Sequence, residues 1–347
     1  MKKFLLFLFT LLSTSAILLG GNPDRQGEAG AYELLLNPWA RSAGLHTMST
    51  SLVRGVEAMQ LNVAGLGRIN RLEIGFGNCI YLQGTDIQIN AAGLSRKVGA
   101  NGAFGMHLMA LDFGDNLVTT TNQPGGTGAT FSPNFFSLAF GYSHVFENKV
   151  SVGILLRGIS ESLPNVSAFG FAVDAGVQYV TGPRDDFKFG ISLKNVGSPM
   201  VFRGEALSVQ RPSPNGQPYE LTLDQRGARL ELPSQLNIGL SQDLHFGNIN
   251  RLTLVGNFTS NSFTRDLIGA GAEYALKEIF MLRAGYNYEM GVDNKSEAPI
   301  FTGPSAGASL EMPMSKEKKD TRLVIDYAYR ATRVWNGTHN ISVRISL

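Results

Sequence analysis

The chain has 347 residues, of which 40 are glycine, 10% are aromatic and 17% are charged. The charged fraction lies below the roughly 25% that is usual for soluble domains, which favours a membrane barrel over a soluble protein. Of the 30 basic residues, Lys2 and Lys3 belong to a predicted signal peptide; the remaining 28 balance 28 acidic residues, so the charge gives no support for a nucleic-acid partner.

The chain begins with a pattern typical of a secretory signal peptide. Lys2 and Lys3 precede the apolar run 4–12, and small residues follow it. We therefore predict that residues 1–21 are a signal peptide that is cleaved between Ala16 and Gly21. No later stretch has the ~18 consecutive apolar residues that a transmembrane helix needs, so any membrane span must be built from strands.

Residues 22–69 lack the alternating pattern of the rest of the chain. Asn37 and Pro38 predict a helix start, with Asn as the N-cap and Pro at the first helical position, and Gly44 predicts its end. A second short helix is expected over 56–61. We interpret 22–69 as a plug, with residues 32–67 tucked into or under the barrel.

From residue 70 to the C-terminus, short runs alternate apolar and polar residues, as strands do when one face meets lipid and the other a wet lumen. Ile341, Val343, Ile345 and Leu347 show this in the last run. We therefore predict an all-β fold, a transmembrane antiparallel β-barrel of about 14 strands over 70–347. The expected strands are 71–79, 85–98, 102–113, 135–146, 150–159, 167–180, 187–195, 234–244, 251–259, 267–276, 280–289, 303–312, 322–330 and 338–347.

Loop lengths support a membrane barrel over a soluble sandwich, which would show the same alternation. We assume that the N-terminus is periplasmic, so that the first strand starts on that side. The connections that follow even-numbered strands are then short, whereas the long segments 114–134, 196–233 and 290–302 all follow odd-numbered strands. Outer-membrane barrels sort their loops in this way, with short periplasmic turns and long outer loops. A soluble sandwich has no reason to do so, and we expect the bacterial outer membrane as the location.

Several charged residues share the inward side of the predicted strands. Charges inside a barrel tend to pair, and such a network holds a plug in place or tunes what passes through the lumen. The sequence allows two interpretations of these charges. They form either a structural ion-pair network in a filled interior or part of a solute pathway. The predicted lumen network consists of Arg157, Asp174, Arg283, Glu289, Asp326, Arg330 and Arg344.

No motif for catalysis is present in the sequence. The five histidines are scattered, with no pair at metal-ligand spacing. Cys79 is the only cysteine, which excludes an intrachain disulfide and a cysteine-rich metal site. The glycine-rich run 125–128 lies in a predicted outer loop and not between a strand and a helix, so it does not predict a phosphate site. We expect no enzyme activity, no cofactor and no metal.

The longest predicted outer loop, 196–233, contains four prolines together with aromatic and arginine residues. Long loops are usually functional or disordered, and aromatic and Arg side chains are common anchors at interfaces. We expect this loop to bind a partner, with a simple lid as the alternative. The candidate partner-binding residues are Phe202, Arg203, Arg211, Tyr219 and Arg226.

Two motifs of the plug carry a family resemblance. The run 37–45, Asn-Pro-Trp-Ala-Arg-Ser-Ala-Gly-Leu, and the run 62–66, Asn-Val-Ala-Gly-Leu, resemble the opening of the PorV/PorQ family of outer-membrane proteins. The second run is similar to an element shared with the FadL fatty-acid transporters, although Val63 stands where the family usually has proline. The plug-motif residues are Asn37, Pro38, Arg41, Gly44, Asn62 and Gly65.

The resemblance implies a FadL-like barrel that acts in type IX protein secretion. Its expected partners are outer-membrane lipid, the type IX translocon barrel and the C-terminal signal domains of secreted cargo, bound through outer loops. The barrel-assembly machinery is expected to recognise the strand end 341–347. The alternative function is a FadL-like transporter of hydrophobic small molecules, which a lateral opening or a kinked strand beside an apolar lumenal pocket would favour.

Overall fold

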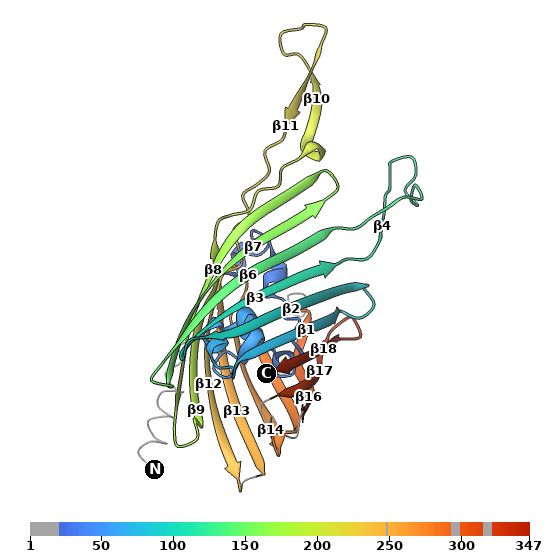
Figure 1. Cartoon of the computed structure of the whole chain (residues 1–347). Coiled ribbons are helices and arrows are strands. Elements are labelled where there is room, and N and C mark those ends of the chain that lie inside the picture. Colours follow the sequence, from blue (N-terminus) through green and yellow to red (C-terminus); the bar gives the residue numbers. More distant parts are fainter. Residues whose placement is uncertain (1–20, 248, 293–298, 315–320) are drawn as a thin grey trace.

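The computed structural model describes residues 21–247, 249–292, 299–314 and 321–347, so the predicted signal peptide lies almost wholly outside the described residues. The chain forms a closed antiparallel barrel of 14 strands, in the order β1-β2-β3-β6-β7-β8-β9-β12-β13-β14-β15-β16-β17-β18 (Figure 1). The first and last strands pair, so this sheet has no free edge.

Every strand predicted from the alternating pattern is present in the barrel. Two of them, β14 and β15, have the predicted bounds, and the others differ by a few residues at one or both ends. The barrel strands are β1 (Leu72–Tyr81), β2 (Ile87–Val98), β3 (Gly102–Asp112), β6 (Asn134–Phe146), β7 (Val150–Leu163), β8 (Val166–Thr181), β9 (Phe187–Gly197), β12 (Gln235–Phe246), β13 (Asn250–Asn261), β14 (Leu267–Leu276), β15 (Phe280–Glu289), β16 (Phe301–Pro313), β17 (Arg322–Thr332) and β18 (Thr338–Ser346).

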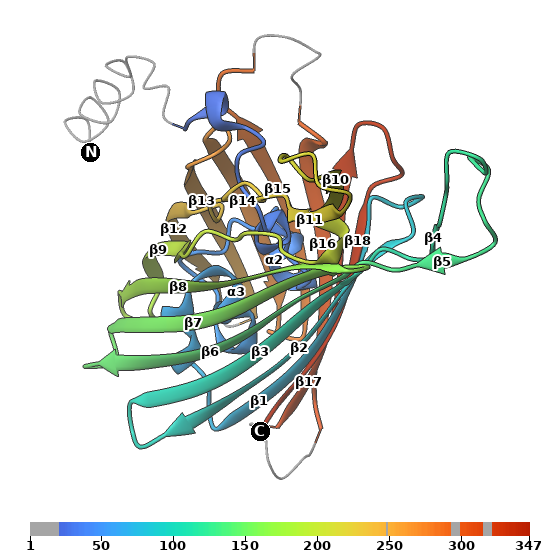
Figure 2. The same cartoon turned by 90° about the horizontal axis from the view of Figure 1, so that it is seen from above.

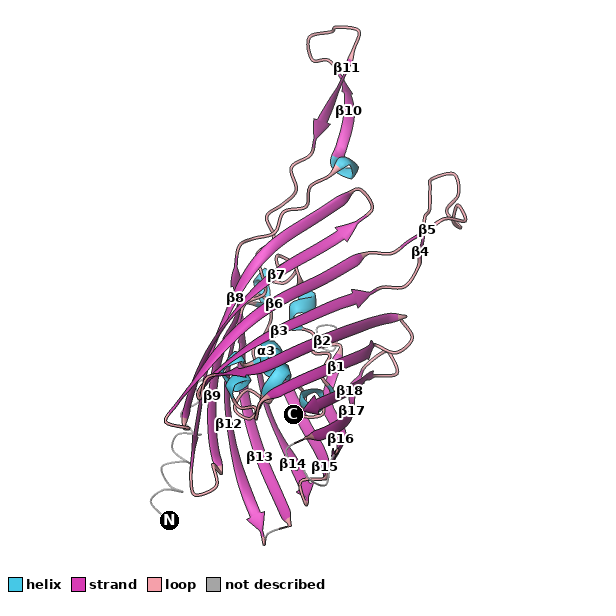
Figure 3. Ribbon diagram, in the orientation of Figure 1, coloured by secondary structure: helices cyan, strands magenta, loops and turns pink. Residues whose placement is uncertain are grey.

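Two of the long loops carry small hairpins that the sequence did not predict. The first consists of β4 (Asn116–Leu117) and β5 (Thr130–Phe131). The second consists of β10 (Ser208–Pro212) and β11 (Glu220–Asp224), preceded by the 3-10 turn η5 (Glu205–Leu207). The β10–β11 hairpin stands clear of the barrel wall (Figures 1 and 3).

The outer surface of the barrel is apolar over most of its circumference. Outward side chains alternate with buried ones along each strand, as in β8, and large apolar residues are more than one-third exposed. They include Phe76, Phe104, Phe140, Leu156, Phe171, Leu240, Leu254, Ile268, Leu282, Ile325 and Ile341. A closed barrel of even strand number with such a belt spans the bacterial outer membrane, where its long loops face outward.

None of the helices in the described part of the chain is long and apolar enough to cross a membrane.

Most of the plug lies inside the barrel, where residues 29–67 are largely buried, whereas 22–28 are mostly exposed at the outer end (Figure 2). Its short helical pieces are η1 (Pro23–Arg25), η2 (Tyr32–Leu35), α2 (Ala40–Ala43), η3 (Gly55–Glu57), α3 (Ala58–Leu61) and η4 (Val63–Gly67). The helix predicted over 56–61 is confirmed as the continuous pair η3 and α3. Plug residues Trp39, Val56 and Leu66 form one buried cluster with Ala103 and Leu155 of the wall.

The predicted start of the first plug helix at Pro38 is wrong. α2 begins at Ala40, because Trp39 has an extended backbone and its ring is packed against Gly75 and Gly77 of β1. Asn37 still organises this turn from outside the helix. Its Oδ1 accepts a hydrogen bond from the Trp39 N–H at 3.0 Å, and its Nδ2 donates to Ser42 Oγ at 2.7 Å.

The plug runs through the lumen from one end of the barrel to the other. Gly21 pairs with Arg265 in the connection between β13 and β14, at the end that carries the long loops. At the opposite end, the Arg68 side chain donates to the Lys149 carbonyl in a short turn, at 2.9 Å. The first barrel strand therefore starts at the periplasmic end, as the loop lengths predict, whereas the first described residue lies at the outer end.

The closing strand β18 is bonded on both sides. Its residues from His339 to Ser346 pair with β1, and Thr338 to Ser346 pair with β17. The sequence 341–347 is thus part of the barrel closure, and its recognition by the assembly machinery stays a prediction.

Candidate functional site

The plug is tied to the wall by hydrogen bonds on several sides. On the β18 side, Asn340 Nδ2 donates to the Asn37 carbonyl at 2.9 Å, and Ser342 Oγ accepts from the Ala40 N–H at 3.2 Å. On the β16 side, Ser305 Oγ donates to the Gly44 carbonyl at 3.1 Å. Because these bonds satisfy plug backbone groups that have no helix or sheet partner, they fix the plug in one position.

The two predicted motifs of the plug are contact points with the rest of the lumen. Asn62 Nδ2 donates to the carbonyls of Thr50 and Val177, at 2.9 and 3.2 Å, and its Oδ1 accepts from the Ala64 N–H. A Cβ on Gly65 would lie 2.1 Å from the Val53 carbonyl oxygen. Only glycine fits that approach, so the Asn-x-Ala-Gly pattern has a packing reason here.

The first motif contacts the wall in the same way. A Cβ on Gly44 would lie 3.1 Å from the Gly307 Cα in β16, so α2 packs directly on the sheet backbone. Arg41 is half-buried in the lumen, and its positive charge acts favourably on the carboxylates of Glu273 and Asp326. Pro38 contributes its carbonyl oxygen to the packing against Gly77, at 3.2 Å from the Cβ position of that residue.

One group of buried charges lies on the wall of β14, β15, β17 and β18. Arg283 pairs with Glu273 at 2.5 Å and approaches Asp326 at 3.9 Å. Arg344 pairs with the other oxygen of Asp326 at 3.1 Å, and Ser309 Oγ bonds both Arg283 and Asp326. Removing one partner from such a buried set leaves an uncompensated charge, which costs about 3–5 kcal/mol.

A second, separate pair lies on the wall of β7 and β8. The Arg157 guanidinium pairs with Asp174 at 3.1 Å. The same guanidinium donates to the Met59 carbonyl and to Gln60 Oε1, at 3.2 and 3.3 Å, and so holds α3 of the plug. This arrangement anchors the plug to the wall with a charge-assisted bond.

The single lumen network expected from the sequence is therefore two separate sets. Arg157 and Asp174 form one set, and Arg283, Asp326 and Arg344 belong to the other, whereas Glu289 and Arg330 face a cavity nearer the outer end. The separation follows from strand position, because residues that share a face can lie on opposite walls of a barrel. Glu273 was missed, although its alternation with outward residues of β14 could have identified it.

Above these charges, a cavity of about 950 Å³ occupies the outer part of the lumen. Plug residues from 23 to 61 form one side, and barrel residues near the outer strand ends form the others. Thr264, Arg265 and Ile300 of the outer connections also line it, so the cavity reaches the outer end of the barrel.

The wall of β12 and β13 presents carboxamide and hydroxyl groups to this cavity. Gln235 Nε2 donates to Asn261 Oδ1 at 2.7 Å, and Thr259 Oγ1 donates to Asn237 Oδ1 at 2.7 Å. Asn257 Nδ2 donates to Thr259 Oγ1 at 3.1 Å, while Asn257 Oδ1 has no partner in the described residues. We call these five residues the amide ladder.

On the facing wall, a cation and aromatic rings line the cavity. The Arg330 guanidinium lies 4.6 Å from the centre of the Phe301 ring, and His46 packs edge-on against the same ring at 5.6 Å. Burial, and secondarily the charge of Arg330, lowers the pKa of His46 to about 4, so its ring is neutral at pH 7. Among the described residues, Arg330 has no carboxylate within ion-pair distance.

Lys194 lines the cavity next to a β-bulge of β9. The register of β8 and β9 shifts between Val173 and Ala175, so Lys194 and Asn195 both oppose Asp174 and both are buried. Asp174 accepts from the Asn195 N–H at 2.6 Å. Lys194 continues the inward alternation of Gly190 and Ser192, and the bulge adds Asn195 as a second consecutive inward residue.

The predicted partner-binding residues of the 196–233 loop fall into two groups. Phe202 packs against the buried cluster of Leu34, Met200 and neighbours, and the backbone of Arg203 pairs with Ser167 in both directions at 2.9 Å. These two residues thus belong to the base of the loop. Arg211, Tyr219 and Arg226 are exposed on or beside the β10–β11 hairpin.

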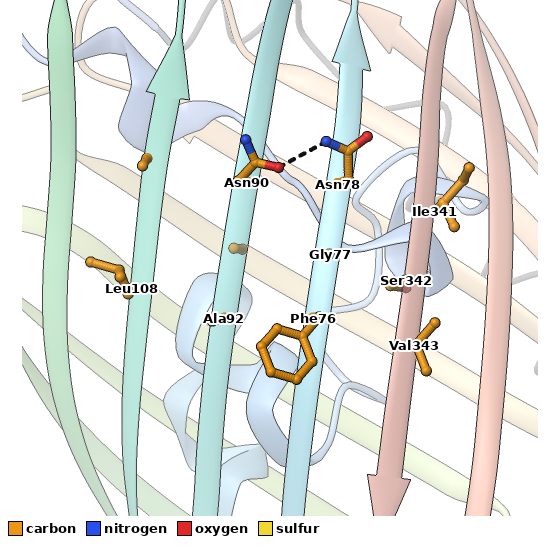
Figure 4. A pocket seen from close by; sticks show the side chains of 11 residues that line it. Phe76, Gly77, Asn78, Asn90, Ala92, Leu108, Ile341, Ser342 and Val343 are labelled. Carbon is orange, nitrogen blue, oxygen red and sulfur yellow. Dashed lines mark hydrogen bonds between the residues drawn. The ribbon is translucent and has the colours of Figure 1, made fainter.

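The lipid side of the wall has a shallow hollow of about 410 Å³ over β1, β2, β3 and β18 (Figure 4). Asn78 Nδ2 donates to Asn90 Oδ1 at 2.8 Å within it, between apolar side chains such as Phe76 and Leu108. The pairing of β1 with β2 and β18 is unbroken behind the hollow, and Trp39 of the plug covers the inner side. These strands therefore contain no lateral opening.

Comparison with known proteins gives the fold. No family model and no curated protein matches the sequence. Solved structures that it resembles include the CymD monoaromatic hydrocarbon channel (15% identity, TM-score 0.56, 91% of this chain and 98% of the other). A second is the Ralstonia pickettii toluene transporter TbuX, with 14% identity and a TM-score of 0.56 over 88% of this chain and 97% of the other. A third is a Pseudomonas aeruginosa FadL homologue, with 12% identity and a TM-score of 0.53 over 89% of this chain and 98% of the other.

The architecture is thus that of a FadL-like barrel over nearly the whole chain. At such low identities the likeness establishes the fold alone, because one fold supports many functions. No match supports the PorV/PorQ branch or type IX secretion specifically.

Proposed function

We propose that this chain is a FadL-like outer-membrane transporter of small molecules. The sequence analysis gave such a transporter as the alternative function, with hydrophobic small molecules as its substrates. The observation that carries the proposal is the lumen itself. A cavity reaches the outer end, and the plug closes the lumen beneath it through bonds to β16, β18 and other strands. A binding cavity above a fixed plug is the arrangement of a gated uptake route.

The neighbours in the comparison support transport as a class, since two of the three are named as hydrocarbon or toluene carriers. In this chain the unbroken pairing of β1 with β2 and β18 favours a route along the lumen over an exit between these strands. Movement along the lumen requires displacement of the plug.

Uptake by whole cells tests this function. The full chain is expressed in a Gram-negative host that lacks its own fatty-acid transporter, and uptake of radiolabelled laurate, toluene and digalacturonate is compared with that of the empty host. We expect faster uptake of at least one of these solutes. Uptake equal to the empty host for all three, from a correctly inserted barrel, would overturn the proposal.

A role in type IX secretion is the second candidate, and the β10–β11 hairpin favours it. Tyr219 is 54% exposed at the hairpin, close in sequence to exposed Arg211 and Glu220. Aromatic and Arg side chains on a projecting hairpin suit protein recognition. Purification from the source bacterium during active secretion should then recover a large translocon barrel or cargo, and a variant without 208–224 should not. Recovery of the chain alone would contradict this role.

A further inference from the structure

The outer lumen cavity has a chemical character that a hydrocarbon does not match. Its amide ladder consists of Gln235, Asn237, Asn257, Thr259 and Asn261, and Gln60, Thr50 and Asn287 also line it. Each carboxamide offers two donors and an acceptor, and the bonds within the ladder use only some of them. A hydrocarbon would displace water from these groups without replacing its hydrogen bonds, which is unfavourable for every group left unsatisfied.

The opposite wall supplies apolar faces as well as polar groups. Tyr81 and Phe301 pack edge to face at 6.4 Å, and Phe301 also contacts His46. Tyr32 of the plug also lines the cavity. A ligand that fits both walls must combine many hydroxyl groups with flat C–H faces, and a sugar ring has both.

Two buried cations give one part of the cavity a charge preference, while the carboxylates of Asp24 and Glu289 also belong to its lining. Arg330 is 4% exposed and Lys194 is 5% exposed, and both line the cavity. Neither has a carboxylate within ion-pair distance among the described residues, in contrast to Arg157, Arg283 and Arg344 deeper in the lumen. Two nitrogens of Arg330 and both nitrogens of His46 also have no hydrogen-bond partner in the described residues. Buried charges are normally paired, so this side of the cavity favours an anionic group.

We propose that the cavity binds an acidic saccharide of one or two rings, with its hydroxyl groups on the amide ladder and its carboxylate directed to Arg330 or Lys194. This inference rests on the proposed transport function and names its substrate class. The volume of about 950 Å³ lies within the range of about 300–1,000 Å³ found for small-molecule sites.

Isothermal titration of the full, detergent-purified chain tests the proposal with digalacturonate as the probe. We expect saturable binding of digalacturonate, at least tenfold weaker binding of the neutral disaccharide cellobiose, and no binding of toluene. Arg330→Gln and Lys194→Met are tested singly. We expect at least one of the two variants to bind digalacturonate at least tenfold more weakly than the wild type. Arg211→Gln, on the hairpin outside the cavity, should leave the affinity unchanged.

Other outcomes overturn the proposal. Binding of laurate or toluene in preference to digalacturonate would assign the cavity to hydrophobic ligands, and absence of binding for every probe would make it a water-filled vestibule. Equal affinity in wild type and in both charge variants would place the ligand elsewhere. Thermal unfolding of each variant shows whether the barrel is intact, and Asn257→Leu, which alters the ladder without removing a charge, provides a second test if a charge variant does not fold.

Titration and cell uptake separate the two proposals. Binding of digalacturonate without uptake of any of the three solutes would rule out the transport function and leave the binding site. Uptake of laurate or toluene without binding of digalacturonate would support the transport function and rule out an acidic saccharide as its substrate.

Discussion

The side-chain oxygen of Asn62 in the plug lies 2.0 Å from the point where a Cβ on Gly176 of β8 would stand. The plug therefore approaches the sheet backbone so closely that β8 must carry glycine there. The same holds at Gly190 of β9, whose Cβ would lie 2.5 Å from the Thr50 carbonyl oxygen. Glycines on the lumen face of the strands therefore leave the space that the plug occupies.

Gly176→Ala should displace Asn62 and weaken the packing of the plug against β8. Overpacking a filled interior typically costs about 1–3 kcal/mol, so the melting temperature of the purified barrel should fall. Gly256→Ala in β13 is the matched control, because nothing lies within 4 Å of its Cβ position. Equal melting temperatures for the two variants would show that the plug does not rest on β8 as described.

Asp326→Asn should destabilise the barrel strongly. The substitution removes the charge that Arg344 pairs with and that Arg283 approaches, and leaving buried charges uncompensated costs about 3–5 kcal/mol. Thermal unfolding in detergent measures the effect, with Glu220→Gln on the exposed hairpin as the control. A loss no larger than that of the control would mean that solvent reaches this part of the lumen.

Stability should fall as the pH rises between about 4.5 and 8, owing to Glu33 of the plug. Burial first, and then repulsion from Glu161, raises the pKa of Glu33 to about 8 from the ordinary 4.5, while Arg157 acts in the opposite direction. The folded state then holds a proton that the unfolded state has released, so its contribution is complete below pH 4.5 and is lost as the pH passes 8.

Melting temperatures measured from pH 5 to pH 8.5 test this dependence. Glu33→Gln should flatten the profile, because the amide does not titrate, whereas Glu28→Gln should keep the wild-type slope. Parallel profiles for wild type and Glu33→Gln would assign the pH dependence to another group.

Much of the barrel is predictable from sequence because lipid imposes a two-residue alternation on every strand. β14 and β15 have the bounds that alternation predicts, and the predicted antiparallel barrel of about 14 strands is confirmed. The plug is harder to predict, since Trp39 takes its extended backbone from packing against β1 and not from any local signal. Helix propensity placed the start of α2 too early for that reason.

The cavity could not be assembled from the sequence. The bulge that turns Asn195 inward next to Lys194 depends on the pairing of β8 with β9, which the alternating pattern does not predict. Glu289 and Arg330 share an inward face with the ion pairs, but their height along the barrel decides whether they meet a partner or the cavity. That height follows from strand tilt and register, which the sequence does not display.

Movement of the plug is the central claim, and a reversible lock tests it most directly. Ser51 Oγ of the plug donates to Ser241 Oγ of β12 at 3.1 Å, so Ser51→Cys with Ser241→Cys can join plug and wall. Ser234 and Ser262, whose hydroxyl oxygens lie 2.7 Å apart outside the plug, provide the matched control pair. Both pairs are made with Cys79→Ser.

The measurement is uptake of laurate, toluene and digalacturonate by host cells before and after reduction of the disulfide. We predict that any solute carried by wild type is blocked by the oxidised 51–241 lock, that reduction restores its uptake, and that the oxidised 234–262 pair has no effect. Uptake at the wild-type rate through the oxidised 51–241 lock would contradict transport through the plugged lumen.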